Sequence, residues 1–212
     1  MDSESFLRER LIDVGVDLVK SEGSASLGLR EIARRAGVSH GAPRRYFPTH
    51  HALLSSIAQR GFQELGSKCA AAVAGAPSPR AQLRAVAGAY IGYALECHGM
   101  FELMFRHDLL DSERHASGER RLRESSLPQF ERIVALVARC RAEQEAAPDS
   151  STPPTVTAAA LWANLHGIAH LWARGSIQLA LGDEPSADAT ADQRLDRLIA
   201  TALDAHLGPV AA

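Results

Sequence analysis

The chain is poor in the residues on which several common kinds of protein depend. Its 212 residues include only 5% aromatic side chains, two lysines and three cysteines, namely Cys69, Cys97 and Cys140. The cysteines are odd in number, widely spaced and never in a Cys-x-x-Cys pair. This spacing favours free thiols in a reducing cytosol over a disulfide framework.

Catalytic motifs are also missing from the sequence. It contains no phosphate-cradling glycine loop, no nucleophile elbow and no pair of carboxylates suited to acid-base chemistry. Asp108, Asp111 and Glu113 do cluster, but they lie beside Arg106 and Arg114, which indicates a solvated ionic turn. We therefore expect neither an enzyme nor a bound cofactor.

The sequence gives no sign of a membrane or export segment. Asp2, Glu4 and Glu9 interrupt the N-terminal region, so a signal peptide is not expected. The long apolar run 156–181 is itself interrupted by four polar residues, Asn164, His166, His170 and Arg174. Charge at membrane depth is costly, so the run predicts a buried helix of a cytoplasmic protein with no membrane partner.

Strand signals are nearly absent, and alanine, leucine and arginine dominate nearly every segment, which predicts an all-α protein. The apolar periodicity predicts about nine helices. Eight of them are expected at 5–21, 40–46, 50–73, 79–97, 99–106, 117–146, 155–181 and 191–207. The remaining helix, the second along the chain, is expected to begin near Ser26. Polar loops are expected at 147–154 and 182–190.

Residues 29–54 have the pattern of a helix-turn-helix. Gly37 can supply the positive φ that a tight turn between helices needs. Ser39 stands at the predicted N-cap of the next helix, and Pro43 lies in its first turn, where a missing N–H costs least. Thr49 is placed to cap the longer helix that follows.

The same region lacks acid altogether. No Asp or Glu occurs from Ile32 to Gln63. The window holds five arginines and three histidines: Arg34, Arg35, Arg44, Arg45, Arg60, His40, His50 and His51. A basic, acid-free helix-turn-helix predicts contact with a DNA phosphate backbone.

In such a contact the third helix enters the major groove with its N-terminus first. Ser39, His40, Gly41 and Arg44 would then face the DNA. An arginine can bind a guanine edge through two hydrogen bonds or make a sequence-independent phosphate contact. The sequence leaves open which of these Arg44 and Arg45 make.

These residues resemble the N-terminal domain of the TetR family of bacterial transcriptional regulators. The resemblance is strongest at ten positions: Ile32, Ala33, Ala36, Gly37, Val38, Ser39, Gly41, Tyr46, Phe47 and Leu53. It implies a homodimer that binds a near-palindromic operator and releases it when a small ligand occupies the C-terminal domain. With the turn-rich stretch 75–79 as a joint, we expect a DNA-binding domain at 1–50, a connecting helix at 51–76 and a ligand-binding and dimerisation domain at 77–212.

Two positions depart from the family pattern. The recognition-helix tyrosine is replaced by Arg44, and the lysine that opens the fourth helix is replaced by His50. Both family residues commonly contact phosphates, so Arg44 would keep that role, while His50 or His51 would supply a weaker contact. The predicted DNA-binding residues are Ser39, His40, Gly41, Arg44, Arg45, Tyr46 and His50.

The C-terminal half carries a second resemblance. Trp162, His166 and Gly167 look like the motif after which a Trp-His-Gly subgroup of TetR C-terminal domains is named. Aromatic and polarisable residues in segments that would face this helix predict a mostly apolar site for a hydrophobic effector. The predicted ligand-binding residues are Phe62, Tyr90, Tyr93, Phe101, Met104, Phe105, Trp162, His166 and His170, with His98 nearby. Plain core packing of the same stripe is the alternative.

Three further expectations concern the C-terminal half. His166 and His170 have the spacing of metal ligands, but no carboxylate stands beside them, so no metal site is expected. A metal- or redox-responsive regulator using these histidines or the cysteines remains the first alternative, and a small enzyme or binding module with an incidental helix-turn-helix the second. Helices 155–181 and 191–207 are expected to pair across a dimer, through Leu195, Leu198, Ile199, Ala202 and Leu203.

Overall fold

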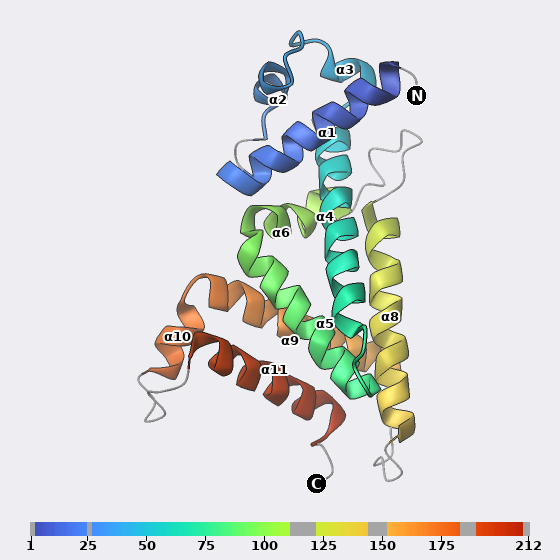
Figure 1. Ribbon diagram of the computed structural model, residues 1–212, viewed down its shortest axis with the longest axis vertical. Coiled ribbons are helices and arrows are strands. Elements are labelled where there is room, and N and C mark those ends of the chain that lie inside the picture. Colours follow the sequence, from blue (N-terminus) through green and yellow to red (C-terminus); the bar gives the residue numbers. More distant parts are fainter. Residues whose placement is uncertain (1–2, 25–26, 111–121, 144–151, 183–189, 210–212) are drawn as a thin grey trace. The chain divides into compact units, whose positions relative to one another are not determined.

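The computed structural model of the protein describes residues 3–24, 27–110, 122–143, 152–182 and 190–209 (Figure 1). These residues form eleven helical segments and no strand, which confirms the all-α prediction. The segments are α1 (Ser3–Glu22), α2 (Leu29–Arg35), α3 (Pro43–Tyr46), α4 (His50–Val73), α5 (Pro79–Glu96), α6 (His98–Met104), α7 (His107–Leu110), α8 (Leu122–Glu143), α9 (Pro154–Ala173), α10 (Ser176–Leu181) and α11 (Ala191–Leu207).

Several boundaries match the sequence-based expectation. Helices α4 and α11 have the predicted limits, and α5 differs by one residue. Thr49 caps α4 as predicted, because its Oγ1 accepts a hydrogen bond of 3.1 Å from the backbone N–H of Ala52. Ser26 and the ends of the predicted helix 117–146 lie outside the described residues.

The single helix predicted at 155–181 is wrong. The helix is interrupted at Gly175, which has φ +74° and separates α9 from α10. A left-handed glycine ends the regular hydrogen-bonding pattern, and its N–H donates instead to the Trp172 carbonyl at 3.0 Å. In the described part of the chain, no helix is both long and apolar enough to cross a membrane.

The chain divides into two compact units. Unit 1 comprises Met1–Glu64 and Cys97–Leu127, and unit 2 comprises Leu65–Glu96 and Pro128–Ala212. Residues 97–127 therefore belong to the same compact unit as the first helices, and the boundary between the units falls inside α4, after residue 64. The predicted domain boundaries were at residues 50 and 76. The assignment of separate functions to 1–50, 51–76 and 77–212 stays a prediction.

Unit 1 is built around a core contributed by its first four helices. Leu11, Leu18, Ile32, Phe47 and Leu53 have no exposed surface. Helix α1 packs against α2, α3 and α6, so the short helices of the helix-turn-helix are held by a longer one. Helices this short are marginal alone, and tertiary packing supplies most of their stability.

Gly37 occupies the turn between α2 and α3 in the left-handed conformation that the sequence predicted, with φ +66°. A Cβ here would lie 3.6 Å from Arg10, an ordinary contact, so the cost of a side chain comes from the backbone. We expect Gly37→Ala to lower the free energy of unfolding of the protein by about 1 to 2 kcal/mol. Urea denaturation measures this change.

Gly88 provides the matched control for that substitution. It lies exposed inside α5 without a positive φ, and a Cβ there meets no atom within 4 Å. Gly88→Ala should leave the free energy of unfolding unchanged or raise it by up to about 1 kcal/mol, because alanine favours the helix and restricts the unfolded chain. Equal destabilisation by both substitutions would contradict the backbone explanation.

In unit 2, α9 packs against α5, α10 and α11, and α11 also packs against α5 (Figure 1). Thr190 and Gln193 form a reciprocal capping box that starts α11. Ile199, Ala202 and Leu203 are buried on the face that α11 turns to its own subunit, which corrects their predicted place across a dimer interface. Leu195 and Leu198 are half-buried.

Candidate DNA interface and effector site

The segment leading into α3 differs in detail from the prediction. Residues 40–42 form a turn, and the α-helix begins only at Pro43, which stands at its first position. Ala42 is the N-cap residue and no side chain caps the helix, so the predicted capping role of Ser39 is wrong. The Ser39 carbonyl instead accepts the N–H of Ala42 at 3.0 Å, which coils the chain before the helix starts.

The structure exposes most of the predicted DNA-binding residues. Ser39, His40, Gly41, Arg44 and Arg45 are all exposed on the turn and on α3. Tyr46 is half-buried, and Pro43 and Phe47 on either side of these arginines point into the core. Helix α3 therefore anchors one face in the unit and presents the other, with its two arginines, to solvent.

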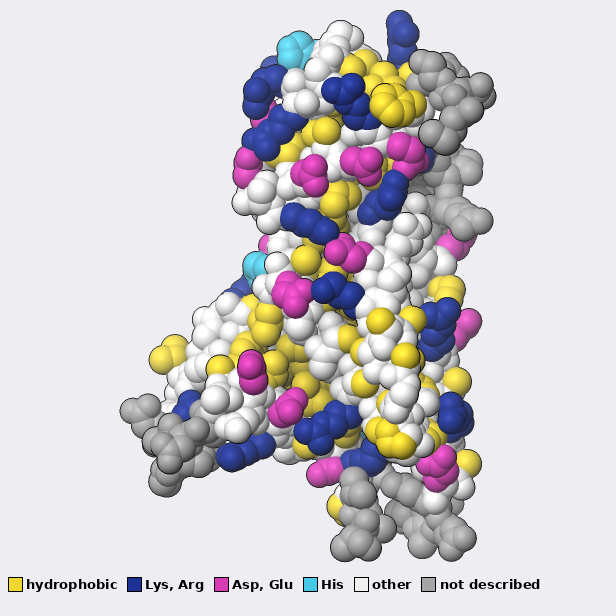
Figure 2. Space-filling model, viewed as in Figure 1, with side chains coloured by type: hydrophobic (Ala, Val, Ile, Leu, Met, Phe, Trp, Pro, Cys, Tyr) yellow, Lys and Arg dark blue, Asp and Glu magenta, His cyan; other side chains and the backbone are white. Residues whose placement is uncertain are grey.

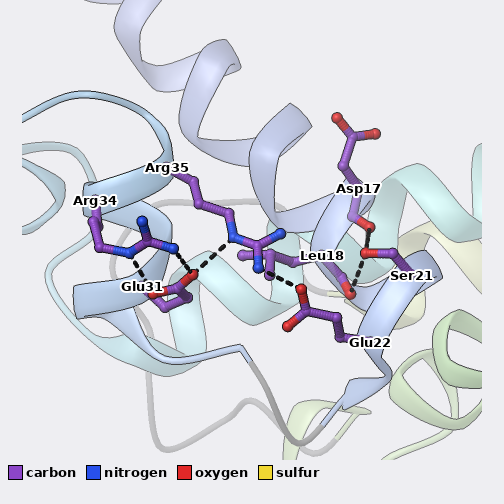
Figure 3. A network of polar contacts seen from close by, with 7 residues as sticks. All are labelled: Asp17, Leu18, Ser21, Glu22, Glu31, Arg34 and Arg35. Carbon is purple, nitrogen blue, oxygen red and sulfur yellow. Dashed lines mark hydrogen bonds and ion pairs between the residues drawn. The ribbon is translucent and has the colours of Figure 1, made fainter.

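The acid-free window of the sequence is not acid-free in space, because acids from outside it pair with three of its arginines. Glu31 binds Arg34 through two hydrogen bonds, Nη2 at 2.6 Å and Nε at 2.9 Å, and binds the Nε of Arg35 at 2.7 Å. Glu22 at the end of α1 pairs with the same Arg35 (Figure 3). Figure 2 shows basic side chains beside acidic ones over α1 to α3 rather than an unbroken basic field.

Arg60 is neutralised in the same way by α1. Its guanidinium pairs with Glu9 and lies 3.7 Å from the Asp13 carboxylate. The i, i+3 and i, i+4 spacing of the Glu31 pairs could be read from the sequence. The pairs with Glu9 and Glu22 could not, because they join residues that are far apart along the chain.

The arginines of α3 are different. Among the described residues, Arg44 and Arg45 have no ion pair or side-chain hydrogen bond. The same holds for Arg30, an exposed residue in the first turn of α2 that was not among the predicted DNA-binding residues. These three side chains carry the uncompensated positive charge on α2 and α3.

His50 has a role that the sequence did not disclose. Its Nε2 lies 2.5 Å from the carbonyl oxygen of buried Leu27. A carbonyl can only accept, so the imidazole N–H donates, and the first turn of α4 is tied to the segment that enters α2. Binding of a DNA phosphate by His50, in place of the family's lysine, would compete with this hydrogen bond. That role of His50 stays a prediction.

His51, the second candidate for that contact, faces an acid. Its Nε2 lies 3.1 Å from the Asp108 carboxylate, which Arg106 also binds at 2.6 Å and 3.0 Å. Arg106, and to a smaller extent His51, lower the pKa of Asp108. The ionic turn expected at Asp108 is confirmed for this pair, whereas Asp111 and Glu113 lie outside the described residues.

The predicted effector residues fall into two groups, one in each unit. In unit 1, Phe105 meets Phe62 and Phe101 edge-to-face, with ring centroids 5.5 Å and 4.9 Å away. Met104 is buried beside Gly61, where an added Cβ would lie 2.6 Å from its sulfur. His98, at the start of α6, is exposed and lies 3.2 Å from Glu102.

In unit 2, three predicted effector residues form a hydrogen-bonded chain. The Trp162 indole N–H donates to the Tyr90 oxygen at 3.1 Å, and that oxygen lies 2.7 Å from His166 Nδ1. An indole N–H only donates, so the Tyr90 hydroxyl accepts from Trp162 and its own O–H is left to donate to a neutral imidazole. Burial raises the pKa of Tyr90, so its hydroxyl keeps that proton. Tyr93, on the same helix, is buried.

His166 and His170 are stacked edge-to-face one turn apart, with ring centroids 4.9 Å from each other. Burial, and secondarily the neighbouring His170, lower the pKa of His166 below its ordinary value of 6.5. The described residues contain no group of three or more His, Cys, Asp and Glu side chains that could hold a metal ion. The two imidazole rings thus contact each other, and His166 also joins the hydrogen-bonded chain of Tyr90 and Trp162.

The lowered pKa of His166 predicts a pH dependence of stability. The unfolded chain binds a proton at this histidine near pH 6.5, whereas the folded chain does so only at lower pH. Stability is therefore lost as the pH falls below that value, at up to about 1.4 kcal/mol per pH unit for one proton. In urea unfolding between pH 5 and 8, His166→Asn should show a shallower acid loss than the unmodified protein, and identical pH slopes would contradict the assignment.

The cysteines form no disulfide. Cys69, Cys97 and Cys140 are all free, as the sequence predicted. Burial raises the pKa of Cys69 to about 11 and is also the main cause of a raised pKa at Cys140. Both thiols are therefore protonated at neutral pH and weakly nucleophilic.

Comparison with known proteins identifies both halves of the chain. Residues 11–57 match the bacterial regulatory proteins of the tetR family, a span that includes α2, the turn, α3 and the start of α4. Residues 83–199 match the Tetracyclin repressor-like C-terminal domain. The Trp-His-Gly subgroup suggested by Trp162, His166 and Gly167 is not distinguished by this match and stays a prediction.

Individual relatives agree with these matches. A helix-turn-helix-type transcriptional regulator in the dhlA 5′ region of Xanthobacter autotrophicus is 33% identical over 98 residues, which are 43% of this chain and 46% of that protein. The chain thus spans about half the length of this curated relative.

Two solved structures have the same fold. A protein of unknown function from Rhodococcus sp. RHA1 has a TM-score of 0.70 and 29% identity, covering 95% of this chain and 93% of its own. A TetR/AcrR-family transcriptional regulator from Thermobifida fusca has a TM-score of 0.59 and 23% identity, covering 93% and 96%. The second family match spans more than half of the chain, and the first coincides with the helix-turn-helix. The protein therefore belongs to the TetR family of bacterial transcriptional regulators, which are DNA-binding proteins and not enzymes.

Proposed function

We propose that the protein is a cytoplasmic, homodimeric repressor that binds a near-palindromic operator and leaves it when a small, mainly hydrophobic effector binds. The observation that carries the proposal is the pair Arg44 and Arg45, exposed and without ion pairs among the described residues, on the short helix of a TetR-family helix-turn-helix. Phosphate contacts by arginine supply affinity, and contacts to base edges supply sequence selectivity.

The helix-turn-helix geometry assigns parts to these residues. Helix α3 would lie in the major groove with the turn residues Ser39, His40 and Gly41 leading, and α2 would cross the phosphate backbone. Gly41 is exposed, and a Cβ there would meet no atom within 4 Å, so the backbone can approach DNA closely. Arg44 and Arg45 follow within one turn of the helix.

The proposed dimer interface uses residues 155–181 together with 191–207. Helices α9 and α10 leave large apolar side chains exposed, including Val156, Leu171 and Leu179, the last with 85% of its surface accessible. The buried stripe of α11 is occupied within the subunit, so these exposed residues are the better candidates. Two recognition helices would then reach successive major grooves, about 34 to 36 Å apart.

The effector is proposed to contact the aromatic side chains of α5 and α9 around Tyr90, Trp162 and His166. Such a site would offer apolar surface and a few hydrogen-bonding groups, the usual composition of a small-molecule site. To act as a switch, the effector must bind the form that cannot hold DNA more tightly, and a 100-fold preference needs only about 2.7 kcal/mol.

The first experiment is selection of binding sites from random duplex DNA with the full chain, followed by salt-titrated affinity measurements on the winning sequence and on mixed-sequence DNA. We expect an inverted repeat, a dimer at the operator, and selectivity of at least about 10³. Equal affinity for both DNAs would contradict the proposal.

Effector class can be tested on the same complex. A panel of hydrophobic and aromatic compounds should contain at least one that releases the operator. Release by a chelator, a metal ion or an oxidant, with no response to the panel, would instead favour the metal- or redox-responsive alternative. His166 and His170 are the residues to replace in that case, because their rings lie together.

A further inference from the structure

We propose that Glu31 is a specificity-determining residue of the helix-turn-helix: by holding both arginines at the end of α2 in ion pairs, it limits sequence-independent attraction to phosphates. The inference rests on the proposed function, since it concerns how the same surface discriminates between DNA sequences. It adds an acidic residue to a site otherwise described by its basic ones.

The geometry shows one carboxylate engaging two guanidinium groups. Oε1 of Glu31 accepts from Arg34 Nη2 at 2.6 Å and from Arg35 Nε at 2.7 Å, while Oε2 accepts from Arg34 Nε at 2.9 Å (Figure 3). Arg34 is thus bound by both carboxylate oxygens. Paired hydrogen bonds of this kind fix a guanidinium in orientation as well as in charge.

A second acid completes the neutralisation. Glu22, at the end of α1, pairs with Nη2 of Arg35, whereas Glu31 binds the Nε of the same residue. Two carboxylates and two guanidinium groups therefore leave this cluster with no net charge. The two arginines hold the pKa of Glu31 at about 2, with Arg34 the larger cause, so the carboxylate stays ionised at neutral pH.

The positive charge that remains on α2 and α3 then belongs to Arg30, Arg44 and Arg45, which have no ion pair among the described residues. Affinity from charge alone is indifferent to sequence and acts on every site in a genome. Selectivity depends on the ratio of affinities for the operator and for bulk DNA, so arginines on α2 whose charge is paired with carboxylates favour discrimination at the expense of total affinity. Glu31 is the residue that sets this balance, because among the described residues it is the only hydrogen-bond partner of the Arg34 side chain and one of two for that of Arg35.

A purely structural role would have a different signature. The Glu31 pairs are exposed, and exposed ion pairs contribute little to folding stability. Loss of Glu31 should therefore change DNA binding far more than it changes unfolding. Arg34 is the more exposed partner, with 65% of its side chain accessible, and is the one released completely.

The test compares Glu31→Gln with the unmodified protein on mixed-sequence duplex and on the selected operator, at a series of salt concentrations. We expect tighter binding to mixed-sequence DNA, and a log-log salt slope steeper by about 0.9 for each released arginine that reaches a phosphate. The operator affinity should rise less, so the selectivity ratio falls several-fold.

Glu96→Gln is the matched control. It removes the same charge and also breaks an exposed ion pair, that of Glu96 with Lys68, but in the other compact unit. It should leave both the salt slope and the ratio unchanged. A second variant, Glu31→Gln combined with Arg34→Gln and Arg35→Gln, should return the mixed-sequence affinity to near the unmodified value.

The outcomes separate this inference from the proposed function. If the unmodified protein shows no selective binding, the repressor proposal fails, while the mixed-sequence salt slope still tests Glu31. If Glu31→Gln matches the unmodified protein or the Glu96→Gln control in slope and ratio, Glu31 has no such role. A large loss of stability in Glu31→Gln, with unchanged DNA binding per folded molecule, would also overturn the inference.

Discussion

Replacing Arg44 and Arg45 together with alanine is expected to lower operator affinity by roughly 10- to 100-fold for each arginine, since each contact is worth about 1 to 3 kcal/mol. Both side chains are exposed on α3, and neither has an ion pair among the described residues, so their charge is available to DNA. Salt-titrated binding should show a flatter slope for the double variant. Pro43 and Phe47, which lie on either side of them, are buried, so we expect α3 to stay anchored in both variants.

The matched control removes the same number of arginines from the neighbouring helix. Arg34→Ala with Arg35→Ala deletes two guanidinium groups that are already paired with Glu31 and Glu22. A much smaller loss of operator affinity is expected from it. Equal losses from both double variants would mean that DNA responds only to net charge, and that α3 is not the recognition element. The single substitutions would then show whether Arg44 or Arg45 carries selectivity, because loss of a base contact relaxes the sequence preference and loss of a phosphate contact does not.

Phe47→Ala is expected to destabilise the protein by about 3 to 5 kcal/mol. The Phe47 ring has no exposed surface, closes α3 onto the core of unit 1 and carries the Arg8 guanidinium 5.2 Å from its centroid. Its loss removes apolar burial and leaves a cavity, at a cost comparable with much of the stability of a small domain. Denaturant unfolding would show a lower midpoint, and operator binding should fall at temperatures where the variant begins to unfold.

Phe6→Ala is the control for this substitution, because Phe6 is the same residue type in the same unit but 60% exposed. Its effect on unfolding should stay within about 0.5 kcal/mol. Phe47→Leu should recover a large part of the loss by refilling the cavity. A Phe47→Ala variant as stable as Phe6→Ala would show that the helix-turn-helix does not depend on this anchor.

Local signals were enough to predict most helices and the turn between α2 and α3. The positive φ of Gly37, the cap of α4 by Thr49 and the limits of α4 and α11 follow from residues within a few positions of each other. Two predictions were wrong, the Ser39 cap and the single helix at 155–181, because other residues nearby determined where those helices begin and end. A proline at the first position of α3 and coiled residues before it removed the need for a Ser39 cap, and Gly175 ended α9 where an apolar run continued.

The arginines show most clearly which properties the sequence determines and which depend on tertiary structure. Composition and motif spacing alone point to an all-helical DNA-binding regulator with arginines around a helix-turn-helix, because periodicity and turn chemistry are local properties. Which arginines remain unpaired depends on α1, whose Glu9 and Glu22 reach Arg60 and Arg35 across the fold. The donation by His50 to Leu27 and the chain from Trp162 through Tyr90 to His166 also join distant residues. Tertiary packing decides these contacts, since hydrogen bonds and ion pairs act over a few ångströms in space, whatever the separation along the chain.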